Sequence, residues 1–305
     1  MKQEDLALLG RLQRPEGMID AVLDTDTFNE IDDQFALSYL IRSTERIRVR
    51  GLYAAPFFNQ HSSGPADGME RSYQEILNLL RLAGRRDLEA VTFRGSERYL
   101  PSETEAVDSP AARALVAEAM AHTPEAPLYV VAIGAITNVA SAVLLEPAIR
   151  ERIVIVWLGG HSFEWPNTEE FNMRQDVAAA RVVFGCGAAV VQLPCMGVVS
   201  SFTTTGPELK EHLAGKNALC DYLVRHTCEE VAAYNTDGIW SRVIWDVTAV
   251  GWLMGGDLME DRIVPSPIPQ YDHHYSHDPS RHPAKYVWYI NRDALMRDLI
   301  TKLTK

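Results

Sequence analysis

The sequence predicts an α/β protein with a mostly parallel central sheet flanked by helices, organised around a Rossmann-like core. Short apolar runs of strand length alternate with longer stretches that are apolar at helical spacing. Such alternation is typical of parallel sheets wrapped by helices. The apolar runs also end in Asp, Asn or Gly, and ligand sites of such sheets lie beyond the carboxyl ends of the strands.

The first part of the chain predicts three strands and three helices. Residues 18–23 form an apolar run that ends at Asp24, and residues 32–42 place their apolar side chains on one helical face. Ser109 and Pro110 favour the N-cap and first turn of a helix that follows them. The expected strands are 18–23, 47–55 and 88–93, and the expected helices are 32–42, 68–83 and 111–121.

The remainder continues the alternation and then becomes mainly helical. Residues 128–133, 153–158 and 188–193 are strand candidates, separated by the helix candidates 138–145 and 176–184. Residues 207–247 favour helix, with a second helical stretch over 219–234. Residues 265–283 are rich in Pro and His and predict a loop, and residues 292–303 predict a closing helix.

Composition and charge narrow the class of protein. The chain has 305 residues, 47% hydrophobic and 23% charged, with no repeat or low-complexity linker, so we expect a single domain over residues 1–305. The net charge of −12 disfavours nucleic acid and anionic membranes as partners. Four cysteines without a CxxC pair favour a reduced, cytoplasmic chain.

Four aspartates within ten positions are the strongest chemical signal. They stand where a buried strand is expected to end and a helix to begin, so their repulsion and burial are costly unless a cation lies among them. A dipole effect at the helix start explains two acids but not four. Carboxylate ligands favour a hard ion such as Ca²⁺ or Mg²⁺. The residues are Asp24, Asp26, Asp32 and Asp33.

Four separated segments of the chain resemble the nucleoside hydrolases of the inosine–uridine type. The enzymes of that family are Ca²⁺-dependent N-glycosidases of ribonucleosides. The DTD…DD pattern of residues 24–33 is similar to the opening aspartate motif of that family. IGAITNVA at 133–140, LGG at 158–160 with EEFN at 169–172, and WDVTA at 245–249 follow in the order of the family. The resemblance implies a nucleoside hydrolase-like fold, a nucleoside substrate, bound Ca²⁺, and homodimers or homotetramers.

Residue roles follow from the resemblance, position by position. It implies that Asp26 binds the metal and takes a proton from the attacking water, and that Asp33, Asp246 and the main-chain carbonyl of Ile133 complete the protein ligands. Asp24 would support the loop. The implied substrate-binding residues are Asp32, Asn59, Glu170 and Asn172 for the ribose hydroxyls, with Trp245 and Asn167 as further contacts. His161 is a substrate-contact candidate on separate grounds, because it follows the end of an expected strand, and a hydrogen bond within its loop is an equal alternative.

Two departures from the family pattern affect these roles. Five residues, 27–31, separate Asp26 from the aspartate pair where three are usual, so the loop must bulge and Asn29 or Glu30 can enter the site. Trp245 also stands where many members that accept pyrimidines have a histidine. The resemblance to purine-preferring members, in which tryptophan stacks on the base, favours a purine nucleoside, while a plain core position for Trp245 is an equal alternative.

Two other functions remain open at this point. VLDTDT at 22–27 also resembles the motif of haloacid-dehalogenase-type phosphatases, in which Asp24 would be the nucleophile and Asp26 the acid. That interpretation leaves the EEFN, ITN and WD segments unexplained. The altered loop is also compatible with a catalytically weak protein that binds a nucleoside or ribose without hydrolysing it.

Overall fold

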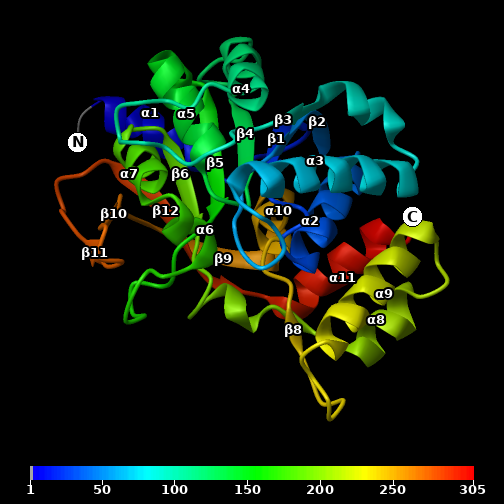
Figure 1. Ribbon diagram of the computed structural model, residues 1–305. Coiled ribbons are helices and arrows are strands. Elements are labelled where there is room, and N and C mark those ends of the chain that lie inside the picture. The colour runs from blue at the N-terminus through cyan, green and yellow to red at the C-terminus, as the bar shows by residue number, and fades with distance from the viewer. Residues whose placement is uncertain (1–2) are drawn as a thin grey trace.

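A mostly parallel sheet flanked by helices forms the centre of the molecule, as predicted, and it has eight strands. The computed structural model describes residues 3–305, so the first two residues of the expected domain lie outside it. The strand order is β3-β2-β1-β4-β5-β6-β12-β9, and every neighbouring pair is parallel except β12 and β9 (Figure 1). The strands are β1 Ile19–Thr25, β2 Ile47–Ala54, β3 Thr92–Arg94, β4 Leu128–Ala132, β5 Ile153–Leu158, β6 Ala189–Leu193, β9 Met259–Pro265 and β12 Pro283–Ile290.

Helices cover both faces of the sheet because successive strand residues point to opposite sides. In β1, Ala21 and Leu23 pack into one apolar core, whereas Val22 packs into the other. One face carries α4 Pro110–Met120, α5 Thr137–Leu145 and α7 Val177–Gly185. The opposite face carries α1 Gln3–Arg11, α2 Ile31–Arg42, α3 Pro65–Leu82, α8 Gly206–Leu213, α9 Ala218–Ala232, α10 Val247–Met254 and α11 Arg292–Leu303 (Figure 1).

The predicted secondary structure was partly wrong in three segments. Most of the strand expected at 88–93 is the 3-10 helix η1 Arg86–Val91, where the Thr92 hydroxyl donates to the carbonyl of Leu88. The helical region expected at 207–247 breaks after α9, because Arg242–Val243 forms strand β8 and pairs with β7 Thr203–Thr204. The loop expected at 265–283 contains the short hairpin of β10 Ile268–Pro269 and β11 Tyr275–Ser276.

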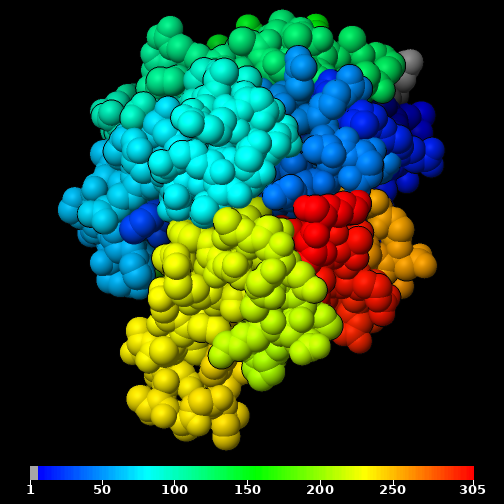
Figure 2. Space-filling view, turned by 90° about the vertical axis from the view of Figure 1, so that its right-hand side faces the viewer, coloured from blue at the N-terminus to red at the C-terminus, as the bar shows by residue number. Residues whose placement is uncertain are grey.

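The segment between α9 and β8 projects from the body of the molecule (Figures 1 and 2). Ile239 in this segment is 83% exposed, the most exposed large apolar side chain of the described residues. Because β8 continues into α10, this projection is connected directly to the carboxyl edge of the sheet.

Two sequence features concern the environment of the chain. None of the helices in residues 3–305 is long and apolar enough to cross a membrane. The four cysteines are free thiols, and Cys195 and Cys220 are buried, as expected for reduced side chains that pack as small apolar groups.

Candidate active site

Three buried aspartates at the carboxyl edge of the sheet form a compact set of oxygen ligands. Asp32 and Asp33 occupy the first turn of α2, and Asp246 is the N-cap residue of α10. One carboxylate oxygen of each lies within 4.8 Å of the other two. Burial, and then repulsion from neighbouring aspartates, raises the pKa of Asp33 and Asp246 well above the usual range. A proton or a cation must therefore lie among these oxygens.

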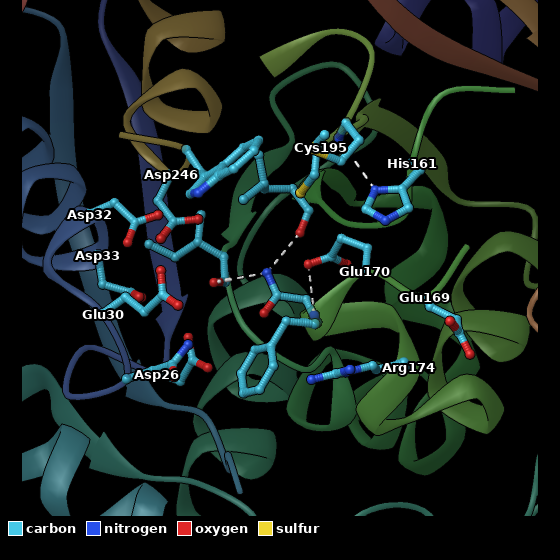
Figure 3. Close-up of a pocket in the computed structure, with 17 residues that line it drawn as sticks. Asp26, Glu30, Asp32, Asp33, His161, Glu169, Glu170, Arg174, Cys195 and Asp246 are labelled. Carbon is cyan, nitrogen blue, oxygen red and sulfur yellow. Dashed lines mark hydrogen bonds between the residues drawn. The ribbon is translucent and has the colours of Figure 1, made fainter. Parts of the chain in front are cut away.

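Asp26 lies beside this set, on the same side of the pocket as Asp32 and Asp33 (Figure 3). It follows β1 directly and is fully buried. The absence of a side chain at Gly134 makes room for it, since a Cβ there would lie 3.1 Å from Asp26 Oδ1 and 3.0 Å from the Ala55 Cβ. Burial, followed by repulsion from Asp33 and Asp32, raises its pKa.

The unpaired oxygens of the cluster fit a hard cation. Both carboxylate oxygens of Asp26, together with Oδ1 of Asp32 and Oδ1 of Asp246, are buried and make no hydrogen bond within the described residues. Buried polar atoms normally have partners, so four such oxygens in one place are suited to bind a positively charged group. Oxygen-only donors are the ligands that Ca²⁺ and Mg²⁺ prefer. The buried aspartate cluster is therefore able to bind a metal ion.

Asp24 has a structural position behind the pocket. Its Oδ1 accepts a hydrogen bond of 2.7 Å from the amide of Asn138 in α5, which also donates to the carbonyl of Ala54 at the end of β2. Burial raises the pKa of Asp24 to about 7. Asp24 is not among the residues that line the pocket. Through Asn138 it connects the ends of β1 and β2, and its role in supporting the loop stays a prediction.

The pocket is a cavity of about 270 Å³, near the lower end for small-molecule sites. Ile133 and Leu158 line it: Ile133 directly follows β4, and Leu158 is the last residue of the neighbouring strand β5. The Asn172 side chain donates to the carbonyl of Ile133 at 3.2 Å and to that of Leu158 at 3.0 Å. A carbonyl oxygen has two lone pairs, so the Ile133 carbonyl keeps one acceptor position for a further partner.

Glu170 connects the pocket wall to the short helix α6 Phe171–Gln175. As the N-cap of α6, its carboxylate accepts hydrogen bonds from the backbone N–H groups of Asn172 and Met173, and also from that of Gly160. These bonds satisfy a helix start and hold the turn after β5. Its oxygens are thus largely occupied by the fold, although Glu170 also lines the pocket.

Three aromatic rings line the pocket, those of His161, Phe171 and Trp245. His161 Nδ1 accepts a hydrogen bond of 3.3 Å from the backbone N–H of Met196, which leaves Nε2 to carry the proton in the neutral ring. Burial lowers the pKa of His161, which favours that neutral form. Trp245 lines the pocket, and its side chain also packs against the apolar core.

Comparison with known proteins identifies the family of the chain. Residues 21–283 match the family described as inosine-uridine preferring nucleoside hydrolases. The chain belongs to this family. Members of the family hydrolyse the N-glycosidic bond of ribonucleosides, and that is the reaction of this enzyme.

Individual relatives support the assignment. The nucleoside hydrolase is 26% identical over 249 residues to a probable uridine nucleosidase 2 of Arabidopsis thaliana, which covers 72% of this chain and 73% of that protein. Its fold is similar to that of a purine-preferring ribonucleoside hydrolase from Gardnerella vaginalis, with a TM-score of 0.74 at 20% identity, over 93% of this chain and 98% of the other. A plant nucleoside hydrolase, PpNRh1, gives 0.73 at 20% identity over 95% and 99% of the two chains.

Family membership resolves the alternative functions. The phosphatase interpretation needs Asp24 as an exposed nucleophile, but Asp24 is buried, bonded to Asn138 and outside the pocket. The interpretation as a mere binding protein is set aside by membership of a family of hydrolases.

Most of the residues expected in the site of this nucleoside hydrolase do meet in one pocket, and two do not. Asn59 donates to Asn29, an additional residue of the longer loop, and it is Asn29 that lines the pocket. Asn167 accepts from the backbone N–H of Glu169 and stays outside the lining. The expected residues that do line it are Asp26, Asp32, Asp33, Ile133, His161, Glu170, Asn172, Trp245 and Asp246.

Several residues at the site are additional to the expected set, and some of them had no sequence signal. Glu30 and Asn29 enter the pocket, as the longer loop suggested. Arg174 and Cys195 also line it, and Arg242 lies 3.9 Å from Asp32. An isolated arginine 210 positions from the aspartate pair has no pattern to reveal it, and only the observed pairing of β7 with β8 brings it there.

Proposed function

We propose that this nucleoside hydrolase acts on purine ribonucleosides, with Ca²⁺ at the aspartate cluster and Asp26 as the general base. The observation that supports this most is the group of unpaired, buried oxygens on Asp26, Asp32 and Asp246 beside the pocket. Asp33, Asp246 and the carbonyl of Ile133 would be ligands, together with Asp26. Asp32 and Asn172 would bind the ribose hydroxyls.

The reaction places different demands on these residues. A bound cation supplies an anchor for the ribose hydroxyls and makes water a better nucleophile. Asp26 takes a proton from the water that attacks the anomeric carbon, as its unpaired carboxylate oxygens permit. The bond to the base breaks with its electron pair on the base nitrogen, which takes up a proton from solvent, while Asp26 releases the water's proton to solvent. The carboxylates stabilise the positive charge that develops on the sugar.

The choice of a purine rests on Trp245. Its ring lines the pocket beside Asp246, where an aromatic face is available to a flat base. Glu170, Asn167 and Asn59 have smaller roles in this proposal than the resemblance implied, because backbone groups or Asn29 already occupy their polar atoms. His161 would contact the substrate through its Nε2–H.

The remaining expectations concern the whole chain. We propose that residues 1–305 act as one domain, that the enzyme is cytoplasmic, and that it forms homodimers or homotetramers. The free cysteines are consistent with a reducing compartment. Size-exclusion chromatography with light scattering measures the oligomeric state directly.

Release of free ribose from a panel of nucleosides, with and without a chelator, tests this function. We expect inosine, adenosine and guanosine to be cleaved faster than uridine and cytidine. We also expect the chelator to abolish release and Ca²⁺ to restore it. Full activity in chelator would overturn the role of the cation, and preference for pyrimidines would overturn the role of Trp245.

A further inference from the structure

An arginine beside the aspartate cluster has no role in the reaction described above. Arg242 in β8 forms ion pairs of 2.6 Å with Glu30 and 3.0 Å with Glu230, and its guanidinium is 3.9 Å from Asp32 Oδ1. Its side chain is only 14% exposed. A guanidinium with this little solvent exposure is held in one place by its carboxylate partners.

The partners of Arg242 come from separate parts of the chain. Glu30 belongs to the longer loop and is the N-cap residue of α2, while Glu230 lies in α9. The arginine therefore joins the longer loop to α9 and β8, immediately before the aspartate pair.

Asp32 lies between Arg242 and the position proposed for the cation. On one side, its carboxylate is within 4.8 Å of those of Asp33 and Asp246, so it is able to close on a cation as a third ligand. On the other side, its unbonded Oδ1 is the oxygen measured to Arg242. A fixed guanidinium attracts this carboxylate and repels a divalent cation, and both effects keep Asp32 from turning fully toward the ion.

We propose that Arg242, anchored by Glu30 and Glu230, is a positioning residue that keeps Asp32 available to the ribose diol instead of to the metal. This inference rests on the proposed function. It explains how Asp32 stands among the possible metal ligands and still binds sugar. The two additional residues of the loop supply Glu30, which makes the arrangement possible.

The variant Arg242→Gln tests the proposal through binding as well as turnover. Titration calorimetry of the chelator-treated protein should show Ca²⁺ binding about fivefold more tightly than in the wild type, because a nearby positive charge is lost. With Ca²⁺ present, KM for inosine should rise about tenfold, since a carboxylate contact to the diol is weakened. The preference for inosine over 2′-deoxyinosine should fall by a similar factor, with kcat less affected.

Matched variants separate this role from general damage. Arg242→Lys keeps the charge and should recover part of the wild-type KM. Arg225→Gln removes an exposed arginine of α9 whose carboxylate partner is 4.0 Å away, and should leave both Ca²⁺ affinity and KM unchanged. Glu30→Gln should raise KM in the same direction as Arg242→Gln.

The outcomes are distinct from those that test the reaction itself. Weaker Ca²⁺ binding by Arg242→Gln, or an unchanged ratio between inosine and 2′-deoxyinosine, would overturn the positioning role even if the wild type is a fully active hydrolase. If the wild type released no ribose, the proposed function would fail. The comparison of ribose with 2-deoxyribose binding would then still test the role of Arg242.

Discussion

Asp26 is the residue on which the proposed chemistry depends most. It is buried, and neither carboxylate oxygen has a hydrogen-bond partner among the described residues. Asp26→Asn keeps the shape but removes the basic oxygen, so kcat for inosine should fall by about 10³-fold. Asp67→Asn, at an exposed helix start, is the control and should retain wild-type kcat. A near-normal rate for Asp26→Asn would exclude this residue as the base.

A substitution at Gly134 tests how precisely the Asp26 carboxylate must be positioned for catalysis. A methyl group there would meet Asp26 Oδ1 at 3.1 Å and the Ala55 Cβ at 3.0 Å, so the carboxylate must shift by a few tenths of an ångström. We expect Gly134→Ala to reduce kcat about tenfold while it changes the melting temperature little. Gly10→Ala, where a Cβ meets nothing within 4 Å, is the matched control. Equal activity of both variants would show that the glycine has no role in positioning.

Glu170 shows how a short element supports the site. Its carboxylate accepts three backbone N–H groups at the start of α6 and in the turn after β5. Glu170→Gln should lower the free energy of unfolding by about 1–2 kcal/mol and raise KM, because α6 also carries Asn172. Glu146→Gln removes a comparable cap in η2 Pro147–Glu151, away from the pocket, and should leave KM unaltered. If the two glutamines affected KM alike, α6 would not be positioned by this cap.

Elements with strong periodicity were predictable, and short or non-local ones were not. The strand at 153–158 and the helix at 292–303 match β5 and α11, since each is a continuous run with one clear pattern. The five residues of α6 are too few to show helical periodicity. Strand β12 pairs with β9 on one side and with β6 on the other, across long separations, and no local signal specifies those partners.

At the scale of the molecule, the sheet topology assembles the site from distant segments. The sequence predicted the ends of β1, β4 and β5 as the place for ligands, and the pocket lies there. It also predicted Asp246 from a match to the family pattern. It did not predict where the longer loop would turn, because that depends on Arg242 and Glu230, which reach Glu30 only in the folded chain.

The buried acids also couple stability to pH and to the cation. Burial raises the pKa of Asp32 to about 7 and raises those of Asp33 and Asp246. The folded state thus holds protons more tightly than the unfolded chain, so the stability of the cation-free protein should fall as pH rises from about 4 to about 7. Because Ca²⁺ displaces those protons, the gain in melting temperature on adding Ca²⁺ should grow over the same range. Melting curves in chelator and in Ca²⁺ check this, and a gain that shrinks with rising pH would contradict it.

The central claim is that the aspartate cluster holds one divalent cation next to the sugar site. A crystal grown with Ca²⁺ and measured for its anomalous signal tests it most directly. We predict one peak per chain, with oxygens of Asp26, Asp33, Asp246 and the Ile133 carbonyl at about 2.3–2.6 Å. A peak bound by other residues, or no peak at a Ca²⁺ concentration that supports full activity, would contradict the account.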